Sequence, residues 1–233
     1  MPKTADKLLW QLEKFDLLEG LDQRQLEKLS SWVKDQVVKG GESIYLPGEP
    51  SEAIYFLKWG RVKLSHVEPD GRELTVSIFG KGEPFGEMAL LKEEKRSLRA
   101  KALEESRLCW LSKRDFLEFV REAPSLSLKI AKLIGFRRRK IENQLENLVF
   151  KDVPTRLART LLKLGQEHGT RKKRGTKIGP RFTHKDLANL IGSTRETTTA
   201  TLNRFEKEGI IEKGWASFLI LDEAKLREKA ELG

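Results

Sequence analysis

The stretch from Thr183 to Gly209 combines two short helical patterns with a glycine turn between them. Gly192, at that turn, can take a positive φ angle without steric cost, and Ala188 is small enough to let two helices pack closely. The arrangement predicts a helix-turn-helix, with an ordinary helical hairpin of another all-α domain as the alternative. The apolar positions recur at helical spacing, as Leu187, Leu190 and Ile191 and then as Thr198, Leu202 and Phe205.

The start of the second pattern favours the DNA-binding interpretation. Thr194 is a good N-cap, so the helix should begin near Thr194 or Arg195 and expose Arg195, Glu196 and Thr199 in its first turns. Arginine can pair with guanine and glutamate can accept from cytosine in the major groove. The hydroxyls of Thr194 and Thr197 suit phosphate contacts, which fix the register of a protein on DNA. We therefore expect these residues to contact double-stranded DNA.

The distribution of charge agrees with this expectation. The formal net charge is +10, and the excess is uneven. Residues 151–233 contain 18 Lys and Arg against 11 Asp and Glu, whereas residues 1–150 contain 27 against 24. A basic C-terminal third around a helix-turn-helix is typical of a phosphate-neutralising surface, although a highly charged soluble surface gives the same composition.

Other features limit the class of protein. Cys109 is the only cysteine and lies in an apolar run, which predicts a buried, inert thiol and argues against an internal disulfide or a cysteine-held iron–sulfur cluster. No apolar run is long enough to span a bilayer, and the N-terminus lacks the apolar core of a signal peptide, so we expect a cytoplasmic protein. His66, His168 and His184 are too scattered for a metal site and are expected to be surface or turn residues.

The N-terminal half changes from helical to strand-like patterning. Residues 4–34 have the periodicity of amphipathic helices. From Gln36 to Leu111, short alternating runs separated by glycine turns predict an antiparallel barrel or sandwich. The strand-like runs are residues 37–38, 43–46, 53–57, 61–64 and 74–79.

Residues 125–151 predict one long helix that opens after Pro124. Its apolar positions form the a/d seam of a two-stranded coiled coil, so a homodimer is expected; packing of part of the stripe on the β domain is the alternative. The seam comprises Ala131, Ile134, Arg138, Ile141, Leu145 and Leu148, and the basic run 137–140 is expected to be solvated.

The remaining C-terminal segments surround the helix-turn-helix. Asp152 to Pro154 should break the long helix, and residues 154–166 predict another amphipathic helix. The basic stretch 169–179 is expected to be a loop, either on the DNA backbone or a disordered connection. Residues 210–220 predict a hairpin, and a short charged helix should follow Asp222.

The residues from Leu187 to Ile211 resemble the winged-helix DNA-binding segment of the CRP/FNR family, the cyclic-AMP receptor protein and its relatives. In that family the R-E-T run opens the recognition helix, so the resemblance implies that Arg195 and Glu196 read bases. Many members have another arginine where Ala200 stands, which implies an operator different from the commonest half-site of the family.

The order of the strand-like runs resembles the cyclic-nucleotide-binding β-roll. Within it, the residues from Phe85 to Leu91, followed after four residues by Arg96 and Ser97, resemble the phosphate-binding cassette of that fold. The resemblance implies an effector site at Gly86, Glu87, Met88, Arg96 and Ser97. Arg96 would pair with a cyclic phosphate, Ser97 would add a hydroxyl contact, and Glu87 would accept from a ribose hydroxyl. The alternatives are an empty pocket and a structural ion pair between Glu87 and Arg96.

Family members that bind cyclic AMP carry a hydroxyl pair on the long helix, and here those positions are Ile141 and Glu142. A cyclic nucleotide or another small effector is therefore expected, but the sequence does not favour cyclic AMP. The oxygen sensors of the family need a cysteine cluster, and the carbon monoxide sensor has a haem-ligating histidine where Met88 stands. Neither an iron–sulfur cluster nor haem is expected.

Together these features predict an α+β chain in three parts: a cyclic-nucleotide-binding-like β-roll at 1–124, a dimerisation helix and hinge at 125–152, and a winged helix-turn-helix at 153–233. The resemblance implies a homodimeric transcription regulator, an activator in contact with RNA polymerase. A constitutive regulator with a vestigial pocket is one alternative. Another is an enzyme or kinase-type regulatory subunit, but no nucleophile–base–acid constellation, Walker loop or metal-ligand cluster supports catalysis.

Overall fold

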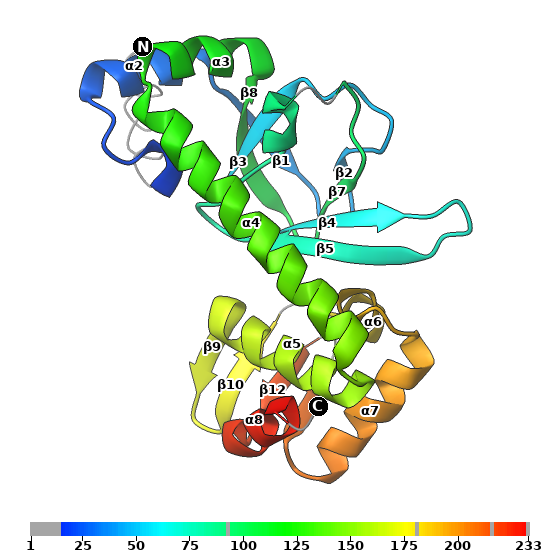
Figure 1. Ribbon diagram of the computed structural model, residues 1–233. Helices are drawn as coiled ribbons and strands as arrows, with labels where there is room; N and C mark the ends of the chain where they lie inside the picture. The colour runs from blue at the N-terminus through cyan, green and yellow to red at the C-terminus, as the bar shows by residue number, and fades with distance from the viewer. Residues whose placement is uncertain (1–14, 92–93, 180–181, 215–216, 232–233) are drawn as a thin grey trace. The chain divides into compact units, whose positions relative to one another are not determined.

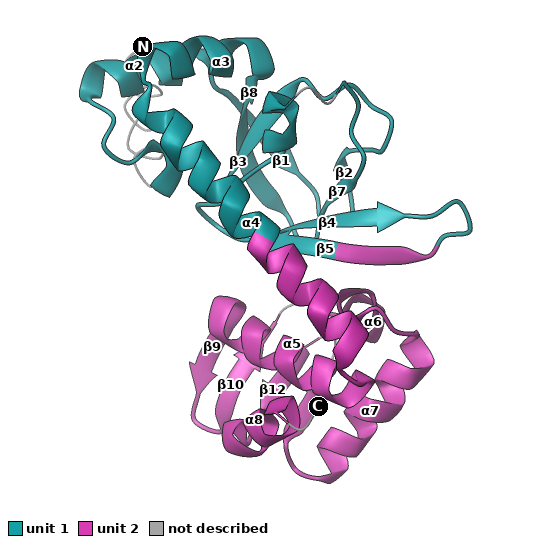
Figure 2. Cartoon of the chain, viewed as in Figure 1, with its two compact units in different colours: residues 1–71, 76–138 teal, residues 72–75, 139–233 magenta. Residues whose placement is uncertain are grey.

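The computed structural model describes residues 15–91, 94–179, 182–214 and 217–231 (Figure 1). The chain forms two compact units (Figure 2). The first comprises residues 1–71 and 76–138, and the second comprises residues 72–75 and 139–233. Part of the helical lead predicted for residues 4–34 lies outside the described residues. Of the remainder, residues 16–18 form the short helix η1 (Asp16–Leu18) and residues 23–32 form α2 (Gln23–Trp32).

Short antiparallel strands form a β-roll of two four-stranded sheets, as the alternating runs predict. The strand order is β1-β8-β3-β6 in one sheet and β2-β7-β4-β5 in the other. The strands are β1 (Lys34–Val38), β2 (Ser43–Tyr45), β3 (Ala53–Trp59), β4 (Val62–Val67), β5 (Glu73–Phe79), β6 (Pro84–Phe85), β7 (Arg99–Ala102) and β8 (Ser106–Ser112).

Strand β3 of the first sheet is buried on both of its faces, because alternate residues of a strand point to opposite sides. In β3, Ile54 and Phe56 face the core that η1, α2 and α3 (Lys113–Glu122) cover. Tyr55 and Leu57 face the interior of the roll. Cys109 of β8 is buried on the helical side, and burial raises the pKa of its thiol to about 12, as expected for an inert residue.

The long helix α4 runs from Ser125 to Phe150, close to the predicted 125–151, and contributes residues to both units. It ends where the sequence predicts a break. The Asp152 side chain accepts a hydrogen bond from the Thr155 backbone N–H at 2.9 Å, and Pro154 lies in the first turn of α5 (Val153–His168). An N-cap and an early proline start a new helix rather than extend the old one.

The exposed side of α4 follows the predicted seam only in part. Ile141 is 46% exposed and Leu145 is 58% exposed. Leu148 is half-buried and lies against Gly192. A Cβ placed on that glycine would lie only 2.6 Å from the Leu148 Cδ2 atom. Leu148 therefore packs against the helix-turn-helix within the second unit, and its place in a dimer seam stays a prediction.

The second unit is a winged helix. Helices α6 (His184–Ile191) and α7 (Arg195–Lys207) pack with α5 and α8 (Glu223–Glu231) beside a four-stranded sheet of order β11-β12-β10-β9 (Figure 1). Strands β11 (Ile211–Gly214) and β12 (Ser217–Ile220) form the predicted hairpin, and α8 is the predicted charged helix.

The basic stretch 169–179 is neither a loop nor a disordered connection. It forms a second hairpin, β9 (Gly169–Lys172) and β10 (Gly175–Ile178), which pairs with β12. Gly175 makes the pairing possible, because a Cβ there would lie 1.9 Å from the Ile220 carbonyl oxygen. Ile178 is buried and anchors the hairpin, whereas residues 171–174 are exposed. Many residues of this hairpin are charged and exposed, and few of its positions are apolar and buried. The sequence therefore lacks the apolar–polar alternation that predicts a strand.

Candidate DNA-binding and effector sites

The turn of the helix-turn-helix is built as the sequence predicts. Thr183 and Asp186 form a capping box at the start of α6, and Gly192 ends that helix in the left-handed conformation with φ 58°. Thr194 is the N-cap of α7, and its Oγ1 atom accepts from the Thr197 backbone N–H at 3.1 Å. Each helix end therefore has its own local stop or start signal.

The buried face of α7 fixes which residues it exposes. Thr198, Leu202 and Phe205 are buried, and the Thr198 hydroxyl donates to the Thr194 carbonyl at 2.8 Å. Helical spacing then directs four of the predicted DNA-binding residues to the surface. These exposed residues are Arg195, Glu196, Thr197 and Ala200.

Thr194 and Thr199 have additional roles within the protein. The Thr194 hydroxyl donates to Thr197 Oγ1 at 3.0 Å while it caps the helix. Thr199 is half-buried, and its Oγ1 atom lies 2.9 Å from His184 Nδ1. His184 is thus joined to α7, whereas the sequence predicts only a surface or turn histidine. No local pattern in the sequence indicated this contact, because it depends on how α6 and α7 pack.

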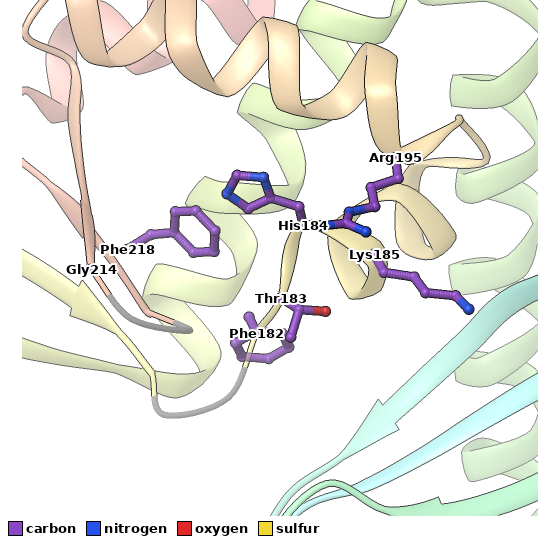
Figure 3. A pocket seen from close by; sticks show the side chains of 7 residues that line it. All are labelled: Phe182, Thr183, His184, Lys185, Arg195, Gly214 and Phe218. Carbon is purple, nitrogen blue, oxygen red and sulfur yellow. The ribbon is translucent and has the colours of Figure 1, made fainter.

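A cleft of about 500 Å³ opens beside the first turn of α7 (Figure 3). His184, Lys185 and Arg195 bring titratable or positive groups to it, and Phe218 of β12 closes one side. The His184 ring lies 5.9 Å from the Phe218 ring, centroid to centroid. Burial and the charges of Lys213 and Arg195 lower the pKa of His184 below its ordinary value of 6.5. A cationic cleft of this kind favours an anion.

The cassette of the first unit forms a compact turn. Gly86 has φ 78° and precedes the short helix η2 (Glu87–Leu90). A Cβ at Gly86 would lie 3.2 Å from the Ala53 carbonyl oxygen and from Arg96 Nη1. Only glycine fits this close approach without displacing a neighbour.

Arg96 lies buried at the centre of the cassette, with 6% exposure. Its Nη1 donates to the Gly86 carbonyl at 3.1 Å and its Nη2 to the Ala53 carbonyl at 2.5 Å. Its guanidinium lies 4.3 Å from the centre of the Tyr45 ring, a cation–π contact. The Nε atom is buried and has no hydrogen-bond partner among the residues that the structure describes.

Glu87 pairs with Arg137 of α4 rather than with Arg96. Arg137 also donates to the Pro84 carbonyl and lies 4.8 Å from the centre of the Phe79 ring. The Arg137 side chain is 17% exposed, so the expectation of a fully solvated basic run was wrong at this residue. The seven-residue period of the helix did not reveal that Arg137 points at the cassette, because the strands that supply its partners are distant in sequence.

The other predicted effector residues are more open. Met88 is 38% exposed and Ser97 is exposed. Ile141 and Glu142 are exposed residues of the second unit, so their approach to the cassette stays a prediction. Within the described ranges, no group of three His, Cys, Asp or Glu could hold a metal ion, and no helix is long and apolar enough to cross a membrane.

Comparison with known families assigns both units. The cyclic nucleotide-binding domain matches residues 35–123, and the Crp-like helix-turn-helix domain matches residues 155–229. Each match contains one of the two sites described above. Together they define the chain as a transcription regulator that combines a cyclic nucleotide-binding domain with a DNA-binding helix-turn-helix.

Relatives of known function extend the match along nearly the whole chain. The Cyclic AMP receptor protein of Thermus thermophilus is 32% identical over 92% of this chain and 96% of its own. The CRP-like cAMP-activated global transcriptional regulator of Mycobacterium tuberculosis is 28% identical over 94% of this chain and 98% of its own. The chain belongs to the CRP/FNR family, whose members are transcription regulators and not enzymes.

Solved structures agree with this fold. A CRP/FNR family transcriptional regulator from Thermus thermophilus has a TM-score of 0.71 and 27% identity, covering 85% of this chain and 98% of its own. The c-di-GMP responsive regulator CLP of Xanthomonas campestris has a TM-score of 0.77 with 24% identity, covering 85% of this chain and 99% of its own. The second comparison concerns the fold alone.

Proposed function

We propose that this chain regulates transcription as a homodimer that binds a two-fold symmetric operator, with α7 in the major groove. The observation that carries the proposal is the first turn of α7. Thr194 caps the helix and Thr198 anchors it, so that Arg195 and Glu196 are exposed together. These two side chains can read adjacent G·C pairs, and Thr194, Thr197 and Thr199 can contact phosphates.

Ala200 limits which base pairs of the operator this chain can recognise. An exposed alanine one turn after Glu196 has no hydrogen-bonding side chain, so it reads at most a thymine methyl group. We therefore propose a half-site in which one position of the commonest family operator is relaxed or replaced.

The base-reading role of Arg195 and Glu196 is tested with DNA that the protein itself selects from a random-sequence pool. Arg195→Ala and Glu196→Ala should each weaken binding to the selected duplex by about 1–3 kcal/mol and change binding to random DNA little. Lys207→Ala removes an exposed charge at the far end of α7 and should leave sequence preference unchanged. Equal losses on selected and random DNA would contradict base reading.

The β-roll is proposed to bind a small anionic effector such as a cyclic nucleotide. Arg96 supports this, because no described residue accepts a hydrogen bond from its buried Nε and an anion would do so. Gly86, Glu87, Met88 and Ser97 would complete the site, with Ile141 and Glu142 from α4. The relatives named for cyclic AMP make that nucleotide the first candidate, although Ile141 and Glu142 do not provide the expected hydroxyl pair.

A constitutive regulator is the second candidate, and a specific observation favours it. Arg96 and Arg137 bond to carbonyls of the roll, and Arg137 pairs with Glu87, so contacts among its own residues hold the cassette together. Measurements of DNA affinity and melting temperature with cyclic AMP, cyclic GMP and cyclic di-GMP separate the two. A change in both quantities with one nucleotide supports gating, and constancy with all of them supports the constitutive form.

Activation implies a contact with RNA polymerase, and a DNA target implies a cytoplasmic protein. We therefore propose that the chain acts in the cytoplasm and activates transcription. Transcription from a promoter carrying the selected operator, with purified polymerase and the homodimer, tests this part: repression by the bound protein would reverse the assignment.

A further inference from the structure

His184 connects the cleft of the second unit to the recognition helix. Its Nδ1 atom lies 2.9 Å from the Thr199 hydroxyl of α7, and its ring packs against Phe218 of β12. Figure 3 shows the Lys185 and Arg195 side chains at the same cleft, with His184 beside them. The imidazole therefore lines an anion-attracting cleft and also contacts Thr199, a residue expected to contact DNA.

The surroundings of His184 oppose a proton on the free ring. Burial, Lys213 of β11 and Arg195 of α7 lower its pKa, whereas Glu206 of α7 raises it to a smaller extent. Glu206 is itself engaged, because it pairs with Lys213 at 2.8 Å. Lys185 is the next residue of α6, and Asp186 after it accepts the hydrogen bond of the Thr183 hydroxyl at 2.6 Å. In the free protein the balance favours a neutral ring.

The protonation state of His184 decides what the Thr199 hydroxyl can do. A hydroxyl has one hydrogen to donate, and neutral imidazole nitrogen Nδ1 accepts it when the other nitrogen carries the proton. A protonated ring donates from both nitrogens. Thr199 Oγ1 then accepts from His184, and the hydrogen of the hydroxyl becomes available to another acceptor.

We propose that His184 is a proton-controlled contact for the DNA backbone, which takes up a proton when a phosphodiester enters the cleft and thereby turns the Thr199 hydroxyl toward DNA. The inference rests on the proposed function, since it requires α7 to face DNA. The ligand of the cleft is one phosphodiester group of the bound duplex, held by Lys185 and protonated His184, while Arg195 stays free to read a base. The proton comes from solvent, and Thr199 exchanges a donated hydrogen bond for an accepted one.

The direction of the pH dependence follows from linkage. The pKa of His184 is below 6.5 in the free protein, and a neighbouring phosphodiester raises it in the complex. Between the two pKa values, DNA binding takes up a proton, so affinity increases as pH falls. Below the lower value the ring is protonated in both states, and above the higher value it is neutral in both, so the contribution is constant outside the window.

The experiment measures affinity for the selected duplex from about pH 5.5 to about pH 8, around the usual titration range of histidine. The dissociation constant of the intact protein should fall by up to about tenfold per pH unit for each protomer within the window. His184→Gln keeps a hydrogen-bonding side chain but cannot take up the proton, so its slope should be close to zero. His66→Gln changes a histidine of β4 that pairs with Glu68 and should keep the full slope.

A second variant tests the hydroxyl. Thr199→Val keeps the shape of the side chain and removes its hydrogen bonds. It should weaken binding at about pH 6 and have little effect at about pH 8, where the wild-type hydroxyl is committed to neutral His184. Equal losses at both pH values would mean that Thr199 acts independently of the proton, and would overturn the coupling.

Two outcomes separate this inference from the proposed function. If the pool yields no enriched duplex at any pH, the proposed function fails. If a duplex is enriched but wild type and His184→Gln have the same slope, DNA binding stands and the proton-controlled contact is overturned. Should His184→Gln not fold, the pKa of His184 in the intact protein, followed by NMR with and without the duplex, decides: no rise on binding refutes the inference.

Discussion

Gly192 is the residue on which the geometry of the helix-turn-helix depends most directly. It combines φ 58° with a close approach to Leu148, so both its backbone conformation and its missing side chain are needed. Gly209 has φ 70°, and no described residue comes within 4 Å of a Cβ added there. A substitution at Gly209 therefore measures the cost of the left-handed backbone conformation without any steric clash. The pair allows two effects to be measured separately.

Gly192→Ala should therefore destabilise the protein more than Gly209→Ala. The left-handed conformation costs a residue with a Cβ roughly 1–2 kcal/mol at either position. Alanine at 192 must also displace the Leu148 side chain, which adds to the loss. Urea unfolding measures both variants, and equal losses would show that Leu148 moves aside freely.

The element that departs most from expectation is the β9–β10 hairpin. Strand pairing with β12 holds its exposed basic residues on the wing sheet, so they form a fixed surface. Arg174 pairs with Glu212 at 2.8 Å, while Lys172 and Lys173 are exposed. A rigid row of positive charge suits contact with the DNA backbone.

Lys172→Gln and Lys173→Gln should weaken binding to selected and random DNA about equally. Removing one lysine–phosphate ion pair should reduce the salt slope of the logarithm of affinity by about 1. Lys39→Gln and Lys81→Gln make the same charge change on the exposed surface of the roll and serve as controls. A salt slope that the hairpin variants leave unchanged would remove the hairpin from the DNA interface.

At the scale of the whole molecule, α4 exposes apolar side chains that the proposed homodimer would cover. Leu145 is 58% exposed, Val149 is 65% exposed and Leu128 is 62% exposed. Pairing two copies along this helix would bury these side chains and make the protein two-fold symmetric. Two recognition helices could then reach half-sites about 34 Å apart.

Leu145→Glu should shift the protein toward monomer, because burying a charge in the helix pair is unfavourable. Sedimentation equilibrium measures the shift, and affinity for the two-half-site operator should fall with it. Leu117→Glu alters an apolar residue of α3 that is 37% exposed and should leave the dimer intact. A Leu145→Glu variant that remains dimeric would place the interface elsewhere.

Local signals in the sequence determined much of this protein. The strand runs of the roll, the end of α4 before Pro154, and the start of α7 at Arg195 all depend on residues within a few positions of one another. Caps, proline and alternation act over such short distances, so they can be read before the fold is known. The β9–β10 hairpin was not predicted, because the roles of Gly175 and Ile178 depend on pairing with β12, which is distant in the sequence.

Only the tertiary structure decided which distant residues meet. Arg137 reaches the Pro84 carbonyl 53 positions away, and His184 reaches Thr199 across the turn, 15 positions away. Neither contact has a period or spacing in the sequence, because the packing of separate elements creates it. The sequence by itself therefore determined the class of protein and its helix-turn-helix, and the fold decided which charges surround the cassette at Gly86 and which histidine contacts α7.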